Sequence, residues 1–164
     1  MAQRILYIRN GIQIPIDVTP KVFSGKKLTV LYAGRGTPEK RVHLVARIAL
    51  LCKLEKLPID FTFLGDVRPY LDNSLAEAGN FVGNISDQEK VESIYRQSDI
   101  LIITSSEEGF PMVVMEAMAR GCIILATPVG DLPAHIHQSR QGFLFSTVTD
   151  EEKITSVPKY IFLK

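Results

Sequence analysis

The sequence has few cysteines, little net charge and no long apolar run. Cys52 and Cys122 are its only cysteines, both lie among apolar residues, and no cysteine or histidine has metal-site spacing. We therefore expect two buried thiols rather than a disulfide, which favours a cytosolic protein. The net charge of +1 gives no reason to expect nucleic acid or a membrane surface as a partner. No stretch resembles a signal peptide or a membrane-spanning helix.

Short apolar runs rich in β-branched residues alternate with stretches of helical periodicity along the 164 residues. This alternation predicts an α/β domain with a doubly wound, mainly parallel, Rossmann-like sheet and helices on both faces. We divide the chain into a leading strand at 4–9 and a lead-in (together 1–27), the domain (28–148) and a tail (149–164). Strands are expected at 28–33, 59–64, 80–83, 100–104, 122–126 and 142–145. Helices are expected at 38–56, in the second half of 67–79, at 86–98 with Ser86 as its cap, and at 112–120.

Two basic residues follow the first strand, and two acidic residues follow the fourth. Arg35 and Lys40 lie where we expect a helix to begin, and a bound diphosphate would relieve the conflict between these cations and the helix dipole. Glu108 lies in the loop after the fourth strand. Glu116 is the only charged residue in the apolar run 113–119, so we expect a buried helix in which Glu116 has a designated partner.

These four residues are expected to face one another. In the strand order 3-2-1-4, the first and fourth strands flank the switch point where a crevice forms. A helix N-terminus at this edge favours anions. Two carboxylates beside an anion site fit a ligand that carries both hydroxyls and phosphates, such as a nucleotide sugar. A plainer interpretation also stays open, in which the basic residues are solvated surface charges and the acidic ones serve ion pairs or a helix dipole.

The motif E-G-F-P-x-x-x-x-E, from Glu108 to Glu116, is followed by A-M-A-R-G at 117–121. Together they resemble the paired-glutamate motif of retaining glycosyltransferases with the GT-B fold, and in particular those of family four. Asn10-Gly11-Ile12 is similar to the step that joins the two domains in that family. The resemblance spans residues 10–148. It implies that the chain is the donor-binding C-terminal half of a GT-B fold, and that an N-terminal acceptor domain is absent from it.

The resemblance implies roles for individual residues. Arg35 and Lys40 would hold the diphosphate and stabilise the leaving nucleotide diphosphate, so no metal ion or other cofactor is expected. Glu108, the third residue with a part in catalysis, would bind sugar hydroxyls, and Glu116 would accept both ribose hydroxyls. Further positions would line the nucleotide-sugar site, mainly through backbone groups: Gly34, Gly109, Phe110 and Met112, with Val82 and Gly83 at the base. Arg41 departs from the family, which often has glycine after this lysine.

The implied activity is transfer of a hexose from a nucleotide sugar to a glycan or lipid-linked acceptor, in polysaccharide biosynthesis and in the cytoplasm. The absent domain would bind the acceptor and make any membrane contact, so residues 1–164 alone would be inactive. Two alternatives stay open: a non-catalytic nucleotide-binding module, and another GT-B enzyme such as a nucleotide-sugar epimerase. A dinucleotide-binding oxidoreductase is disfavoured, because Gly34-Arg35-Gly36 lacks the third glycine of that fingerprint.

Overall fold

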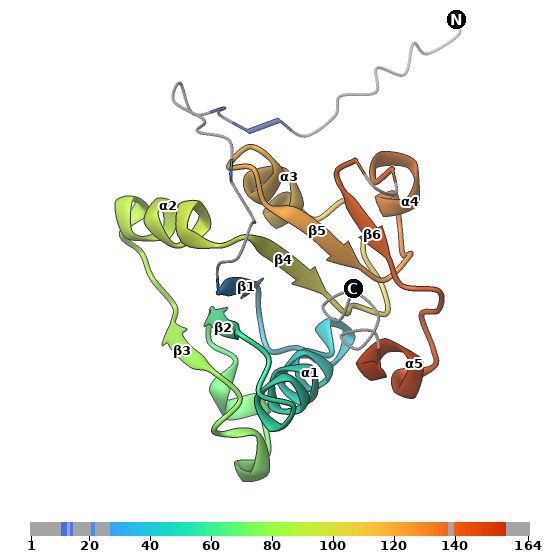
Figure 1. The fold of residues 1–164 in the computed structure, drawn as a ribbon. Coiled ribbons are helices and arrows are strands. Elements are labelled where there is room, and N and C mark those ends of the chain that lie inside the picture. Colours follow the sequence, from blue (N-terminus) through green and yellow to red (C-terminus); the bar gives the residue numbers. More distant parts are fainter. Residues whose placement is uncertain (1–10, 13, 15–20, 22–26, 138–139, 157–164) are drawn as a thin grey trace, which may run out of the picture.

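Parallel pairing joins six short strands into one sheet (Figure 1). This computed structural model describes residues 11, 12, 14, 21, 27–137 and 140–156. The leading strand predicted at 4–9 lies outside these residues, as do most of the lead-in and half of the tail. The strands are β1 Leu28–Ala33, β2 Ile59–Leu64, β3 Asn80–Gly83, β4 Ile100–Ile103, β5 Ile123–Ala126 and β6 Gly142–Leu144.

The strand order is β3-β2-β1-β4-β5-β6. It confirms the predicted order around the switch point and the doubly wound, Rossmann-like class. β1 and β4 lie side by side at the centre, with Val30 opposite Ile100 and Leu31 opposite Leu101. All four residues of β4 are buried, as expected for a central strand covered on both faces. The ends of β1 and β4 therefore come together at one edge of the sheet.

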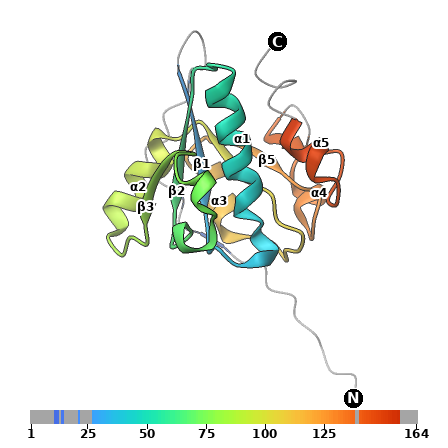
Figure 2. The same ribbon diagram turned by 90° about the horizontal axis from the view of Figure 1, so that it is seen from below.

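Helices cover both faces of the sheet, as predicted. The sheet separates the hydrophobic core into two clusters, one on each face. Side chains alternate along β1: Val30 packs in the cluster under α1 (Val42–Leu54), while Leu31 packs in the cluster under α3 (Met112–Met118). Figure 2 shows α1 running alongside β1 and β2. The first cluster also includes Ile154 of α5 (Glu151–Ser156). The second includes residues of α2 (Gln88–Gln97) and α4 (Leu132–His135).

The prediction of a helix in the second half of 67–79 is wrong. This segment forms two short 3₁₀ turns instead, Arg68–Tyr70 and Asn73–Leu75. The polar run at 72–74 competes for backbone hydrogen bonds in the way that favours turns. Leu75 is still buried, so the apolar pattern was right about burial but wrong about conformation.

The predicted N-terminal cap of α2 is displaced by one residue. Oδ1 of Asp87, not the hydroxyl of Ser86, accepts the backbone N–H groups of Glu89 at 3.0 Å and Lys90 at 3.2 Å. Serine and aspartate are about equally good N-terminal caps. When they are adjacent, the backbone conformation decides which of them caps the helix. The sequence located this helix correctly but could not fix its first residue.

Both cysteines are buried and free, as predicted. Cys52 lies on α1, and burial raises the pKa of its thiol to about 11. Cys122 precedes β5, and burial also raises the pKa of its thiol. Both thiols therefore stay protonated at neutral pH, and that of Cys122 donates to the carbonyl of Ser98 at 3.1 Å.

Asp99 joins the starts of the two central strands. Its Oδ2 accepts the backbone N–H of Thr29 at 2.8 Å, and its own N–H donates to the carbonyl of Thr29 at 2.8 Å. The residue is 9% exposed. A buried acceptor that satisfies the N–H of the second residue of β1 fixes the register of β4 against β1.

Replacing Asp99 with alanine is expected to lower the free energy of unfolding by about 1–3 kcal/mol, because the N–H of Thr29 loses its partner in a buried place. Asp60→Ala is the matched control: Asp60 pairs with Lys27 in an ion pair whose side chains are both 60% exposed, and its loss should cost less than about 1 kcal/mol. Urea denaturation measures both. Equal midpoints for the two variants would contradict the role given to Asp99.

Candidate functional site

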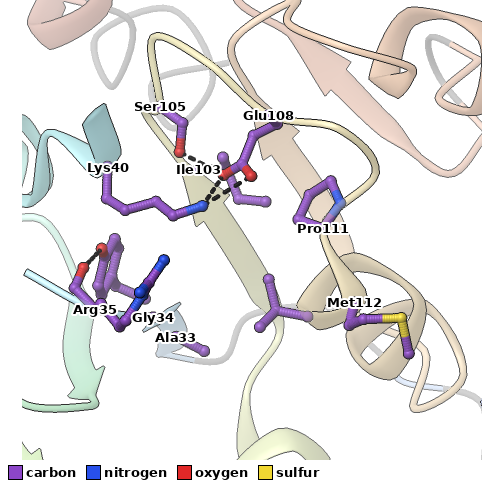
Figure 3. A pocket seen from close by; sticks show the side chains of 11 residues that line it. Ala33, Gly34, Arg35, Lys40, Ile103, Ser105, Glu108, Pro111 and Met112 are labelled. Carbon is purple, nitrogen blue, oxygen red and sulfur yellow. Dashed lines mark hydrogen bonds and ion pairs between the residues drawn. The ribbon is translucent and has the colours of Figure 1, made fainter. Parts of the chain in front are cut away.

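A cleft of about 220 Å³ opens at the C-terminal edge of the central strands. Figure 3 shows that the β1 loop supplies one wall, while the β4 loop and the start of α3 supply the other. Its lining residues are Tyr32, Ala33, Gly34, Arg35, Lys40, Ile103, Ser105, Glu108, Pro111, Met112 and Val113. The structure thus brings Arg35, Lys40 and Glu108 together, as the strand order predicts.

The loop after β1 does not lead directly into an α-helix, contrary to prediction. Pro38–Lys40 forms a 3₁₀ turn, and Arg41 then takes the left-handed conformation with φ of 47°. α1 begins only at Val42, and Thr37 caps no backbone group. Lys40 therefore does not lie in the first turn of an α-helix, and the predicted conflict between its charge and a helix dipole does not arise. Its place in the cleft comes from the 3₁₀ turn.

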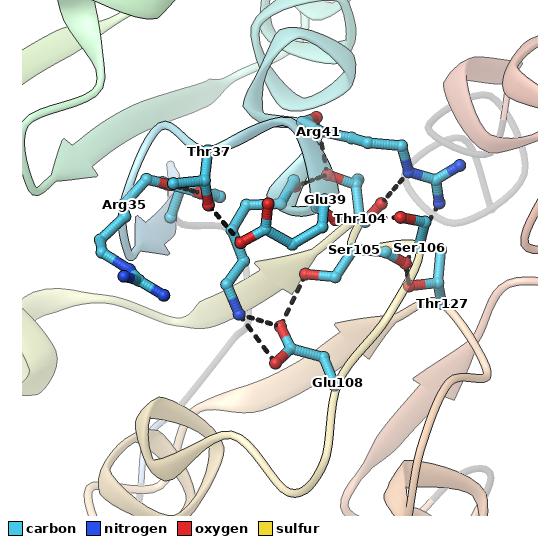
Figure 4. Close-up of polar contacts among 11 residues, drawn as sticks. Arg35, Thr37, Glu39, Arg41, Thr104, Ser105, Ser106, Glu108 and Thr127 are labelled. Atoms are coloured by element: carbon cyan, nitrogen blue, oxygen red, sulfur yellow. Dashed lines mark hydrogen bonds and ion pairs between the residues drawn. The ribbon is translucent and has the colours of Figure 1, made fainter.

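Arg41 binds the β4 loop through its side chain. Its Nε donates to the carbonyl of Thr104 at 2.6 Å, and Nη2 donates to that of Ser105 at 3.2 Å (Figure 4). Nη1 donates to the carbonyl of Val148 at 2.5 Å. Desolvation lowers the pKa of Arg41, but an arginine stays charged at neutral pH. A glycine would suit the left-handed backbone better, so these bonds explain why an arginine can occupy the position.

More hydrogen bonds connect the same two loops. Thr104 is fully buried, and its hydroxyl donates to the carbonyls of Lys40 at 3.2 Å and Arg41 at 3.0 Å. The N–H of Ser106 donates to the carbonyl of Glu39 at 2.8 Å. A third loop also supports the β4 loop, because the hydroxyl of Thr127, after β5, donates to the carbonyl of Ser105 at 2.6 Å. The two walls of the cleft are therefore held at a fixed separation.

Lys40 and Glu108 form an ion pair across the cleft. Nζ of Lys40 lies 2.7 Å from Oε1 and 2.8 Å from Oε2 of Glu108, and the hydroxyl of Ser105 donates to Oε1 at 2.7 Å. The side chain of Glu108 is 9% exposed and that of Lys40 is 22% exposed. Sequence reasoning placed both residues in the cleft but missed their direct contact. It also missed Ser105, which gave no signal beyond its place at the end of the strand.

Arg35 is exposed, and its guanidinium forms no hydrogen bond or ion pair with any residue that the structure describes. Its backbone is held instead, because the hydroxyl of Tyr32 donates to the carbonyl of Arg35 at 2.7 Å. Burial, and then the charges of Glu108 and Glu39, raise the pKa of Tyr32, so its hydroxyl remains a donor. The cleft thus has one uncommitted cation beside a paired one.

The predicted site residues at the base and ribose do not line this cleft. Glu116 is half-buried on α3, and its Oε2 accepts the hydroxyl of Tyr95 at 2.7 Å, so its partner is a tyrosine rather than a cation. α3 as a whole is not fully buried, contrary to prediction: only Val114 and Ala117 are. Val82 and Gly83 lie at the end of β3.

Gly109 and Phe110 lie next to the cleft without lining it. The carbonyl of Gly109 accepts the N–H of Asp131 at 3.1 Å, and the ring of Phe110 meets His135 edge-on, with 4.6 Å between centroids. Gly130, which the sequence did not mark as a site residue, has φ of 55°, and a Cβ there would lie 2.2 Å from the carbonyl oxygens of Glu108 and Gly109. Only glycine lets this second loop support the first so closely.

The arrangement defines a Rossmann-like domain with a polar cleft at its switch point, where such folds bind ligands. Residues 15–159 match the family described as glycosyl transferases group 1, and the chain belongs to this family. The D-inositol 3-phosphate glycosyltransferase of Mycobacteroides abscessus is 31% identical over 77 residues, which are 47% of this chain and 17% of the relative.

Solved glycosyltransferases share the fold. The apo lipopolysaccharide outer core galactosyltransferase WaaB gives a TM-score of 0.72 at 21% identity, over 94% of this chain and 45% of that chain. The C-terminal domain of the group 1 protein LpcC from Francisella tularensis gives 0.70 at 25% identity, over 85% and 77%. The pneumococcal O-GlcNAc transferase GtfA, in complex with UDP and GlcNAc, gives 0.69 at 21% identity, over 88% and 31%.

These matches fit a C-terminal GT-B domain, as the resemblance implied, since LpcC was solved as a C-terminal domain. The chain spans less than half the length of WaaB, GtfA or the inositol phosphate enzyme. Among the described residues, no cluster of histidine, cysteine and acidic side chains could hold a metal ion. None of their helices has the length and hydrophobicity to cross a membrane.

Arg41→Ala is expected to lower the free energy of unfolding by about 2 kcal/mol or more, because three carbonyls lose a charged donor. Arg41→Gly should lose less, since glycine recovers about 1–2 kcal/mol of left-handed backbone strain. Arg47→Ala is the control, because Arg47 pairs with Glu151 on the surface and its loss should cost less than about 1 kcal/mol. Thermal and urea denaturation measure all three. An Arg41→Ala protein as stable as the wild type would show that the three bonds contribute little.

Proposed function

We propose that this chain is the donor-binding half of a retaining glycosyltransferase, which transfers a hexose from a nucleotide sugar to a glycan or lipid-linked acceptor in polysaccharide biosynthesis. One observation carries the proposal: a chain of the glycosyl transferases group 1 family has Arg35, Lys40 and Glu108 in one cleft at its switch point. Cations and a carboxylate within one cleft can bind the two ends of a sugar diphosphate.

Arg35 and Lys40 are proposed to bind the diphosphate. Nucleotide diphosphate departs with negative charge that grows as the glycosidic bond breaks, and fixed cations stabilise such a transition state. The guanidinium of Arg35 is ready for this role, since it has no partner in the described part of the chain. Two cations at this place supply what a divalent metal ion would otherwise supply, so we expect the reaction to need none.

Glu108 is proposed to bind hydroxyls of the donor sugar. Ser105 holds one of its oxygens, and Lys40 contacts both. Backbone N–H groups at Gly109, Phe110 and Met112 follow at once in the chain, and they would complete the sugar and phosphate site beside Gly34. Glu116 would bind the ribose hydroxyls, and Val82 and Gly83 would contact the base.

The cleft is smaller than the roughly 300–1,000 Å³ of typical ligand sites, at about 220 Å³. It therefore suits the diphosphate and sugar rather than a whole nucleotide sugar. We propose that the acceptor binds to the N-terminal half of a longer protein, which would also make any membrane contact from the cytoplasm. Residues 1–164 alone should then bind the donor without transferring its sugar.

UDP is the first ligand to test, because the solved structure of GtfA is a complex with UDP. Isothermal titration calorimetry with UDP, GDP and ADP should find at least one that binds. Arg35→Ala and Lys40→Ala should each weaken binding about tenfold or more, the usual size of a lost charge-assisted bond. Arg47→Ala, which removes a surface arginine on α1, should leave affinity unchanged. Absence of binding by all three at millimolar concentration would contradict the proposal.

The Glu108→Gln variant distinguishes binding of the diphosphate from binding of the sugar. The variant removes the charge that Lys40 is paired with, so a bare nucleoside diphosphate should bind about threefold to tenfold more tightly, matching a partly exposed ion pair of about 1 kcal/mol. The corresponding nucleotide sugar should bind more weakly relative to that diphosphate, because a hydroxyl acceptor is lost. Calorimetry with UDP and UDP-glucose gives both values. The same fold-change for both ligands would contradict a sugar-binding role for Glu108.

A further inference from the structure

Glu116 is held by an uncharged donor from another helix. Tyr95 of α2 is 2% exposed, and its hydroxyl donates to Oε2 of Glu116 at 2.7 Å. Burial, and then the bond to Glu116, raise the pKa of Tyr95, so the hydroxyl keeps its proton at any physiological pH. Within the described part of the chain, no other group bonds to the Glu116 carboxylate. Among these residues, Oε1 of Glu116 therefore has no hydrogen-bond donor.

Arg120 would be expected to pair with Glu116, since it lies four residues later on the same side of the helix. Its guanidinium is bound elsewhere. Nε donates to Oε2 of Glu92 at 2.7 Å, and Nη2 lies 2.5 Å from the same oxygen. Nη1 donates to the backbone carbonyl of Glu116 at 2.9 Å, not to its carboxylate. Hydrogen bonding from Arg120 lowers the pKa of Glu92, so the pair stays ionised.

The ring of Tyr95 fixes the same arginine. The Arg120 guanidinium carbon lies 5.7 Å from the centroid of that ring, which is within the range of cation–π contact. α2 thus supplies both partners of these α3 groups: Glu92 binds the guanidinium of Arg120, and Tyr95 donates to the carboxylate of Glu116. A carboxylate paired with arginine would have to give up that pairing to bind hydroxyls. A carboxylate that accepts a single tyrosine hydroxyl can bind further hydroxyls without breaking an ion pair.

We propose that Tyr95 is a positioning residue for Glu116, and that Glu92 keeps Arg120 away from Glu116, so that the carboxylate stays free to accept the ribose hydroxyls of the donor nucleotide. The inference rests on the proposed function, which gives Glu116 its ligand. It adds two residues of α2 that do not line the cleft and that precede Glu116 by 21 and 24 positions.

The test compares UDP with 2′-deoxy-UDP and 3′-deoxy-UDP by calorimetry on the chain of residues 1–164; GDP or ADP and their deoxy forms replace them if UDP does not bind. The readout is the ratio of the affinity for the ribonucleotide to that for each deoxynucleotide. The wild type should favour UDP about tenfold or more. Glu116→Gln should remove most of this preference. Tyr95→Phe should reduce it at least threefold, while Tyr70→Phe, which removes the hydroxyl of an exposed ring, should leave it unchanged.

A second set of variants tests Glu92 and serves if Tyr95→Phe fails to fold. Glu92→Ala should free Arg120 to pair with Glu116, and so reduce the preference for ribose at least threefold. The double variant Glu92→Ala/Arg120→Ala should restore it, because the competing cation is gone. A variant that only disturbed the fold would lower the melting temperature without being rescued in this way. Failure of the double variant to restore the preference would overturn the role given to Glu92.

The outcomes separate this inference from the function on which it rests. If none of the three nucleoside diphosphates binds, both are overturned. If UDP binds without any preference for ribose hydroxyls, the ribose role of Glu116 is wrong, and the inference is overturned with it. If Glu116→Gln removes the preference but Tyr95→Phe retains it in full, Tyr95 is not a positioning residue, and the proposed function stands alone.

Discussion

The bonding between the β1 loop and the β4 loop is the constraint on which the rest of the cleft depends. Arg41 donates to the carbonyls of Thr104 and Ser105, and Thr104 donates back to the carbonyls of Lys40 and Arg41. These loops belong to the two halves of a doubly wound sheet, whose strands end at one edge but whose loops need not touch. The bonds hold Lys40 beside Glu108, and all the chemistry proposed for the cleft follows from that separation.

The two carboxylates of the motif are kept in different states. Glu108 is paired with a cation, Lys40, so a ligand of either side chain must compete with this ion pair. Glu116 is bonded to the neutral hydroxyl of Tyr95, while Arg120 binds Glu92 through its guanidinium. The motif therefore contains one carboxylate in an ion pair and one that accepts a hydrogen bond from a neutral hydroxyl.

Local sequence predicted most of the fold because the relevant forces are local. Apolar runs between turn residues fixed the bounds of β1, β2 and β3, and their alternation with helices fixed the strand order. The failures occurred where neighbouring choices have nearly equal energy. Asp87 and Ser86 are both good caps, and the segment 67–79 buries Leu71 and Leu75 without forming an α-helix. Similarly, the path before Arg41 was decided by bonds to a distant loop.

The sequence by itself determined the family, the parallel sheet and the loops that meet at its edge, because motif spacing and hydrophobic periodicity are written along the chain. Only the tertiary structure decided which charges are paired. That Lys40 binds Glu108, that Glu116 has Tyr95 as its partner, and that Gly130 supports the loop beneath Glu108 all depend on contacts between residues far apart in the chain. A hydrogen bond requires two groups within about 3 Å, and no local pattern specifies a distance across the fold.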